Sequence, residues 1–524
     1  MRKRVSVGFA VLIVLAAVAP AAAAGEPSAA VDADGNVAQQ RADPDTDTVG
    51  WESGYWHDDA ISVDQSDGLS DAEMDAYVGR AMARVEYLRQ TEFQSDVPVE
   101  IISRSEFTRN GNSSSNASFV AWNNQVWEAL FVVGEEANVQ SKLQSAVGSS
   151  TAGFYAPSDD RIRIITETPE SPTIDNTTLI HELTHALQDQ NGNLGERLSS
   201  SRTQDGDLAV DGVVEGEANY IEKRYVRRCG SEWDCVAKAS SSGSGSSDPP
   251  NLGILLTLLQ PYSDGPVYID WLLEQGGWSA VDAAFADPPT SSEQIIHRTD
   301  ERPTPIEFED RARNGWKLYP EQGENGSDTV GEASMYVMFW YQARTAGADT
   351  VPVRSLLRTT NPFDMYDYSA EPSAGWGNDR VFPYHKGSGD DAKHGYVWVT
   401  EWDSEQDAAQ FVEAYRAILD AHDATRTNGT YVIPDGEFAD AFRIDRDGTR
   451  VTIVNGPTPE AVSQIRPPGA ATDTGGDGNA AGTTAAAGGD GGSGSTGLGA
   501  PGFGPLTAVI AVIAAFGVLA RRRD

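Results

Sequence analysis

The sequence HELTH at residues 181–185 constrains the fold of this chain more than any other feature. The surrounding pattern predicts a helix over residues 177–190, preceded by N-cap residues and ended by an Asn-Gly pair. On that helix, His181 and His185 lie one turn apart and face the same way. Two imidazoles at this spacing bind one zinc ion (Zn²⁺), and Glu182 beside them can take a proton from a bound water molecule.

A zinc ion needs a third protein ligand, and a second predicted helix at residues 207–228 supplies the candidates. Glu215 lies there among Val, Gly and Ala, where a charge is out of place unless something pairs it. We expect Glu215 to be the third ligand, with Glu217 as its rival, and the small neighbours to let this helix approach the first closely. Asn219, one turn on, is expected to hydrogen-bond a ligand histidine. The alternative is that these histidines and glutamates are ordinary core or surface residues without a metal.

The two helices together resemble the gluzincin branch of the zincin metallopeptidases. The match is the HExxH helix followed by Glu215 in an E-x-x-x-[DN]-like setting, with Asn219 where the family usually has Asp. The resemblance implies an α+β, zincin-like domain that hydrolyses a peptide or protein substrate with zinc-bound water. In zincins, an edge strand that precedes the zinc helix binds an extended peptide, and we expect this role for a strand at residues 161–165.

Residues 287–297 resemble a segment found in a little-characterised group of bacterial and archaeal HExxH proteins. That group also shows HELTHALQDQ, an EG[DE]A helix and a GWG-x-DR turn, which occur here at residues 181–190, 215–218 and 375–380. We expect His297 to act as a second catalytic residue that steadies the oxyanion or protonates the leaving group. Arg298 follows it, where the group usually has Pro. A purely structural role for His297 is the alternative.

The two ends of the chain predict export and attachment to a membrane. Residues 1–24 combine positive charges, a short apolar run and a run of alanines, which is the pattern of a secretory signal peptide. Residues 501–524 contain an apolar stretch closed by three arginines, which is long enough to span a bilayer. Between the folded part and this anchor, residues 467–500 consist almost wholly of Gly, Ala, Thr, Ser and Asp, which is typical of a disordered stalk.

The tripeptide Pro501-Gly502-Phe503 and the tail behind it resemble the PGF-type sorting signal of haloarchaeal cell-surface proteins. The resemblance implies that an archaeosortase removes the tail and that the new C-terminus receives a lipid. A lipid or a retained transmembrane helix would each hold the chain on the extracellular face of the cell membrane. Cys229 and Cys235 fit this compartment, because an oxidising environment would let them close a short loop. Acceptor sequences for glycans occur at Asn112, Asn116, Asn176, Asn325 and Asn428.

The rest of the chain is predicted to form two folded units behind a disordered acidic segment at residues 25–50. Residues 51–310 mix predicted helices and strands and contain every candidate site residue. Residues 311–466 are predicted to form a smaller α/β domain. Within the first unit, the Ser/Gly/Pro-rich residues 240–250 are expected to be an exposed loop.

The charge balance predicts a dependence on salt. The chain has 78 acidic and 39 basic residues, a formal charge of −39, and no basic patch that would bind nucleic acid. Its carboxylates repel one another unless salt screens them, and the Debye length falls from about 10 Å at 0.1 M to about 3 Å at 1 M.

We expect the thermal unfolding midpoint to rise from low to multimolar salt, as measured by circular dichroism. A midpoint that does not change would favour an ordinary acidic protein.

Overall fold

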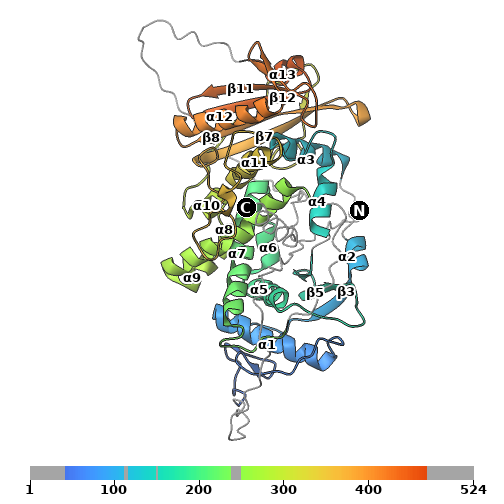
Figure 1. Ribbon diagram of the computed structural model, residues 1–524, viewed down its shortest axis with the longest axis vertical. Helices are drawn as coiled ribbons and strands as arrows, with labels where there is room; N and C mark the ends of the chain where they lie inside the picture. The colour runs from blue at the N-terminus through green and yellow to red at the C-terminus, as the bar shows by residue number, and fades with distance from the viewer. Residues whose placement is uncertain (1–41, 111–115, 149–150, 238–249, 469–524) are drawn as a thin grey trace, which may run out of the picture.

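The computed structural model describes residues 42–110, 116–148, 151–237 and 250–468, and it has the α+β composition expected from the sequence. In Figure 1 a large sheet lies at one end of the molecule and α1 (Asp71–Arg89) at the other, with the long helices between them. The predicted signal peptide, nearly all of the stalk and the sorting signal lie outside the described residues. Within the described ranges, no helix has the length and apolarity needed to cross a bilayer. The short elements near the N-terminus and between the main layers are β1 (Trp51–Glu52), β2 (Tyr55–Trp56), α2 (Arg104–Asn110), α3 (Ala117–Ala129), α4 (Val139–Gly148), α6 (Leu194–Leu198) and α9 (Trp278–Ala286).

A three-stranded sheet supports the helix that carries HELTH, α5 (Asn176–Gly192). Its central strand is β5 (Arg161–Thr166), which pairs in parallel with β3 (Val99–Ser103) and antiparallel with β4 (Gly153–Ala156). The expectation that residues 161–165 form an edge strand is therefore wrong, because both sides of β5 are already paired. The two edge strands are β3 and β4, and β4 contacts α5.

Helix α7 (Gln204–Arg228) lies at the centre of the first unit and packs against α5 and most extensively against α8 (Leu252–Gly276). Gly216 of α7 touches Gly265 of α8 so closely that a Cβ added to Gly216 would lie 2.6 Å from the carbonyl carbon of Gly265. The small residues of α7 were expected to admit the HELTH helix. Gly216 admits α8 instead, because glycine on both helices removes the side chains that would separate the two backbones.

A seven-stranded antiparallel sheet, in the order β6-β7-β8-β12-β11-β10-β9, forms the C-terminal part. Helices α11 (Gly331–Thr345) and α12 (Glu405–Ala421) cover one face and α13 (Pro459–Ile465) covers the other (Figure 1). Side chains alternate along β8, so that Trp398 packs toward α12 and Val397 toward α13. The strands are β6 (Lys317–Leu318), β7 (Trp376–Lys386), β8 (Lys393–Trp402), β9 (Thr425–Thr427), β10 (Thr430–Val432), β11 (Ala441–Asp447) and β12 (Arg450–Gly456).

One apolar core crosses the boundary predicted between residues 310 and 311. Helix α11 comes from the C-terminal side of that boundary, yet it contacts α7, α8 and α10 (Ser292–His297) of the first unit. The same cluster of buried side chains includes Leu255 of α8, Phe339 of α11 and Trp398 of the large sheet. The two units therefore share their interior.

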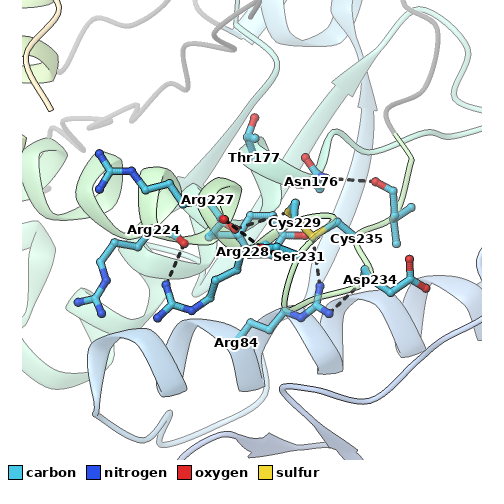
Figure 2. The surroundings of a disulfide bond; sticks show 12 residues. Arg84, Asn176, Thr177, Arg224, Arg227, Arg228, Cys229, Ser231, Asp234 and Cys235 are labelled. Carbon is cyan, nitrogen blue, oxygen red and sulfur yellow. Dashed lines mark hydrogen bonds between the residues drawn. A yellow bond between two sulfur atoms is a disulfide. The ribbon is translucent and has the colours of Figure 1, made fainter. Parts of the chain in front are cut away.

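A disulfide between Cys229 and Cys235 closes a short loop directly after α7, as the cysteine spacing allowed. Figure 2 shows Arg84 of α1 reaching this loop, where its Nη2 donates to the carbonyl of Asp234 at 2.9 Å. Asn176, the first residue of α5, donates its side-chain amide to the carbonyl of the residue that follows the disulfide, at 3.1 Å. The loop thus connects the end of α7 with both α1 and the beginning of α5.

Buried carboxyl groups make the stability of this fold depend on pH. Asp440, before β11, is 4% exposed, accepts a hydrogen bond from Asn455 and interacts with Glu128. Burial raises the pKa of Asp440 to about 7. The folded state therefore holds a proton that the unfolded chain releases above about pH 4. The contribution of Asp440 to the unfolding free energy is largest below that pH. It falls, by up to about 1.4 kcal/mol per pH unit, as pH rises to about 7.

We expect Asp440→Asn to be more stable than the wild type at pH 8 and about equally stable at pH 4, because the amide resembles the protonated acid. Urea denaturation at both pH values measures the difference, with the exposed Asp447→Asn as the control. An equal change at both pH values would contradict the assignment.

Candidate metal centre

Three side chains from two helices converge in the interior. Oε2 of Glu215 on α7 lies 3.0 Å from Nε2 of His181 and 3.4 Å from Nε2 of His185, both on α5. One potential ligand atom of each residue lies within 4.8 Å of the others, and all three side chains are buried. The structure therefore brings together the three residues expected to bind zinc, and it places Glu215 rather than Glu217 against the histidines.

The donor set of this triad fits a zinc ion. Two imidazole nitrogens and one carboxylate oxygen are three of the four positions of a tetrahedral site, and the fourth is left for water or substrate. In the described part of the chain, five buried atoms in and beside the triad have no hydrogen-bond partner, namely Oε1 of Glu182, Oε1 of Glu215, Nε2 of His185, Nδ1 of His181 and Oε2 of Glu222. Buried polar atoms without partners are rare and costly. A cation among them would satisfy the ligand lone pairs.

The electrostatics of the triad also favour a cation. Burial by itself would lower the pKa of His181, but its interactions with the carboxylates of Glu215 and Glu222 outweigh burial and raise this pKa to about 10. Burial by itself would raise the pKa of Glu215, yet its interactions with His185 and His181 lower this pKa to about 2. An interior position that stabilises positive charge this strongly suits a divalent cation, which would displace the proton of His181.

Both histidines turn their Nδ1 atoms toward an acceptor that lies away from Glu215. Nδ1 of His181 lies 3.4 Å from Oε2 of Glu222, and Nδ1 of His185 lies 2.9 Å from Oε1 of Gln188. An acceptor at Nδ1 keeps the ring proton there and leaves Nε2 for a metal. The surroundings of the triad therefore orient each ring for binding through Nε2.

Asn219 does not have the role expected from the sequence. Its Nδ2 donates at 3.0 Å to the backbone carbonyl of Glu215, one turn earlier in the same helix, so the expected bond to a ligand histidine is wrong. The residue beside a ligand histidine is Glu222, which lies 3.4 Å from Nδ1 of His181. Seven residues after Glu215, the helix presents Glu222 on the same face. This spacing is readable in the sequence and is the signal that was missed. Glu217 instead forms an ion pair with Arg89 of α1.

The two residues expected to be catalytic lie in different surroundings. Glu182 is buried, and its Oε2 accepts the backbone N–H of Tyr155 on β4 at 2.8 Å. Burial raises the pKa of Glu182 to about 7, although the neighbouring histidines oppose this shift. Nε2 of His297 lies 2.9 and 3.0 Å from the two carboxylate oxygens of Glu332 at the start of α11, and this hydrogen bond raises the pKa of His297. No described hydrogen bond joins His297 to the triad, so its catalytic role stays a prediction.

Comparison with known proteins bears on the C-terminal part alone. A family described as a domain of unknown function, DUF8575, matches residues 317–466. This stretch contains the seven-stranded sheet with α11, α12 and α13, and it contains none of the triad residues. Comparisons with curated proteins and with solved structures gave no match. These comparisons therefore do not bear on the triad of His181, His185 and Glu215.

The contacts of the triad predict which neighbour matters for metal affinity. Glu222→Ala should weaken zinc binding about 10- to 100-fold, because it removes the acceptor that orients His181. Asn219→Ala, one turn earlier on the same helix, should change it little, since Asn219 bonds only its own helix. Competition with a chromophoric chelator in high salt measures both affinities. A larger loss for Asn219→Ala than for Glu222→Ala would contradict this assignment.

Proposed function

We propose that this chain is a zinc-dependent peptidase of the cell surface, in which His181, His185 and Glu215 hold the ion. The observation that carries the proposal is the convergence of these three side chains in the interior. The order of the parts, an HExxH helix followed by a helix with the third ligand, supports a gluzincin-like domain. The unpartnered buried atoms and the charge balance of the site support a metal rather than a purely structural cluster.

Glu182 is the residue that we assign to proton transfer. A zinc ion bound by the triad would supply a Lewis acid and lower the pKa of a bound water molecule. Glu182 has one oxygen fixed by the N–H of Tyr155, which leaves Oε1 to accept a proton. A pKa near 7 suits a group that must take up and return a proton at neutral pH.

The edge strand supports an extended peptide or protein as the substrate. We infer that a peptide would add along β4, because β4 is the edge of its sheet beside α5. Tyr155 of this strand is bonded to Glu182, so the added peptide would pass the proton-transfer residue. We assign His297 to the oxyanion or the leaving group. Because Nε2 of His297 is bound to Glu332, Nδ1 is the atom that would face the substrate.

The surface location rests on the sequence of the chain ends. A signal peptide and a PGF-type signal, processed by an archaeosortase, would leave the folded part outside the cell on a lipid; an unprocessed tail would leave a membrane helix. The disulfide between Cys229 and Cys235 is consistent with an oxidising environment.

A second candidate is a non-catalytic surface or binding protein that keeps a zincin-like fold. The complete burial of the triad favours this alternative, because closed sites are typical of structural zinc. The two candidates make different predictions for turnover, whereas both expect about one zinc ion per chain.

Glu182→Gln should retain zinc and lose peptidase activity by a factor of about 10² to 10⁴, since the amide keeps the shape but cannot accept the proton. Zinc content is measured by elemental analysis, and cleavage of casein or a mixed peptide library is measured in high salt. Glu196→Gln on α6, a surface position, is the control. Equal cleavage by Glu182→Gln and the wild type would exclude the mechanism. Zinc binding by a wild type that cleaves no substrate would favour the non-catalytic candidate.

A further inference from the structure

A chain of hydrogen bonds leads outward from His185 to a charged residue on α1. Nδ1 of His185 lies 2.9 Å from Oε1 of Gln188, and Nε2 of Gln188 donates to Oε2 of Glu217 at 3.0 Å. The other oxygen of Glu217 pairs with Nε of Arg89. None of these four residues is more than 7% exposed, so water competes little for their hydrogen bonds.

The neighbours of Gln188 determine which way its amide points. Its Nε2 faces two groups that only accept, the carbonyl of Val214 at 3.0 Å and the carboxylate of Glu217. The opposite orientation would place the amide oxygen against both of them. Oε1 therefore faces His185, and an acceptor there requires the ring proton on Nδ1. Nε2 of His185, on the side of Glu215, is left with its lone pair.

Arg89 holds Glu217 in the position that this arrangement needs. Its guanidinium also pairs with Asp282 on α9 and lies over the ring of Trp278, 4.3 Å from the ring centroid. A buried carboxylate without such a partner would be strongly destabilising. The ion pair with Arg89 therefore makes Glu217 a fixed acceptor in the interior.

We propose that Glu217 and Gln188 are positioning residues that set the tautomer of His185, and that Arg89 anchors them. The inference rests on the proposed zinc site and adds a connection between the two metal-bearing helices. Helix α7 supplies one ligand through Glu215 and, through Glu217 and Gln188, prepares a second ligand on α5. None of the three residues belongs to the triad, so they would act only through His185.

The test is the tautomer of His185 in zinc-free protein, read by nitrogen-15 NMR of labelled histidines, of which the chain has seven. The wild type should show the Nδ1–H form, assigned by its loss in His185→Gln. Glu217→Gln should populate the Nε2–H form. An amide at this position can donate to Gln188, so the amide of Gln188 can flip and present its nitrogen to Nδ1 of His185. The same variant should bind zinc about 10-fold more weakly. The matched control, Asp282→Asn, removes only the exposed partner of Arg89 and should behave as the wild type.

The outcomes separate this inference from the proposed function. An Nε2–H tautomer in the wild type, or an unchanged tautomer in Glu217→Gln, would overturn the inference. If Glu217→Gln does not fold, Gln188→Met removes the acceptor that faces Nδ1 of His185. Loss of the Nδ1–H preference in that variant supports the proposal, and its retention overturns it. A wild type that binds no zinc would refute the proposed function, whereas the tautomer of the zinc-free protein would still decide the role of Glu217.

Discussion

A carboxylate in a protein interior is stable only where its surroundings supply positive charge or hydrogen-bond donors. Glu215, in the middle of α7, is such a group, and its two partners are the histidines of α5. The next residue, Gly216, brings the backbone of α8 against α7. The pairing of Glu215 with the histidines holds α5 against α7, and the close packing of Gly216 holds α8 against the same turn. Three helices are therefore fixed around this turn of α7. The site and the core of the first unit are parts of one arrangement.

The two helices that form the site could be predicted from the sequence, because helical spacing sets both the position of a side chain and the face that is buried. The predicted helix at 177–190 and the observed helix Asn176–Gly192 differ by only one or two residues at each end. The helix predicted at 207–228 is observed as Gln204–Arg228. The choice of Glu215 followed from the cost of an unpaired charge among small apolar residues. The same helical spacing places Glu222 beside Glu215, two turns away. The prediction of a hydrogen-bond partner for the ligand histidine considered only Asn219, one turn away.

Features that depend on long-range pairing could not be predicted in this way. Helix α8 contains Pro261 and Pro266 in its interior, where proline normally breaks a helix, so its sequence does not indicate a 25-residue element. The apolar side chains that α8 buries against its neighbours, α7 above all, offset the lost hydrogen bonds. Which of two neighbouring strands becomes the edge of a sheet depends on β3, which comes from far earlier in the chain. The partner of His297 likewise lies on α11, beyond the predicted boundary.

Helix α11 has a consequence for how proteins of this kind can be rearranged. By sequence it belongs to the stretch matched by the family of unknown function, yet its apolar side chains lie in one cluster with those of α7, α8 and α10. The boundary of the matched stretch therefore passes through a hydrophobic core and does not coincide with a boundary between separately packed domains. A chain that carries the matched stretch without α7, α8 and α10 would need another surface to cover α11. Gene fusions that join the two parts differently would thus be selected as much for the fit at this helix as for chemistry.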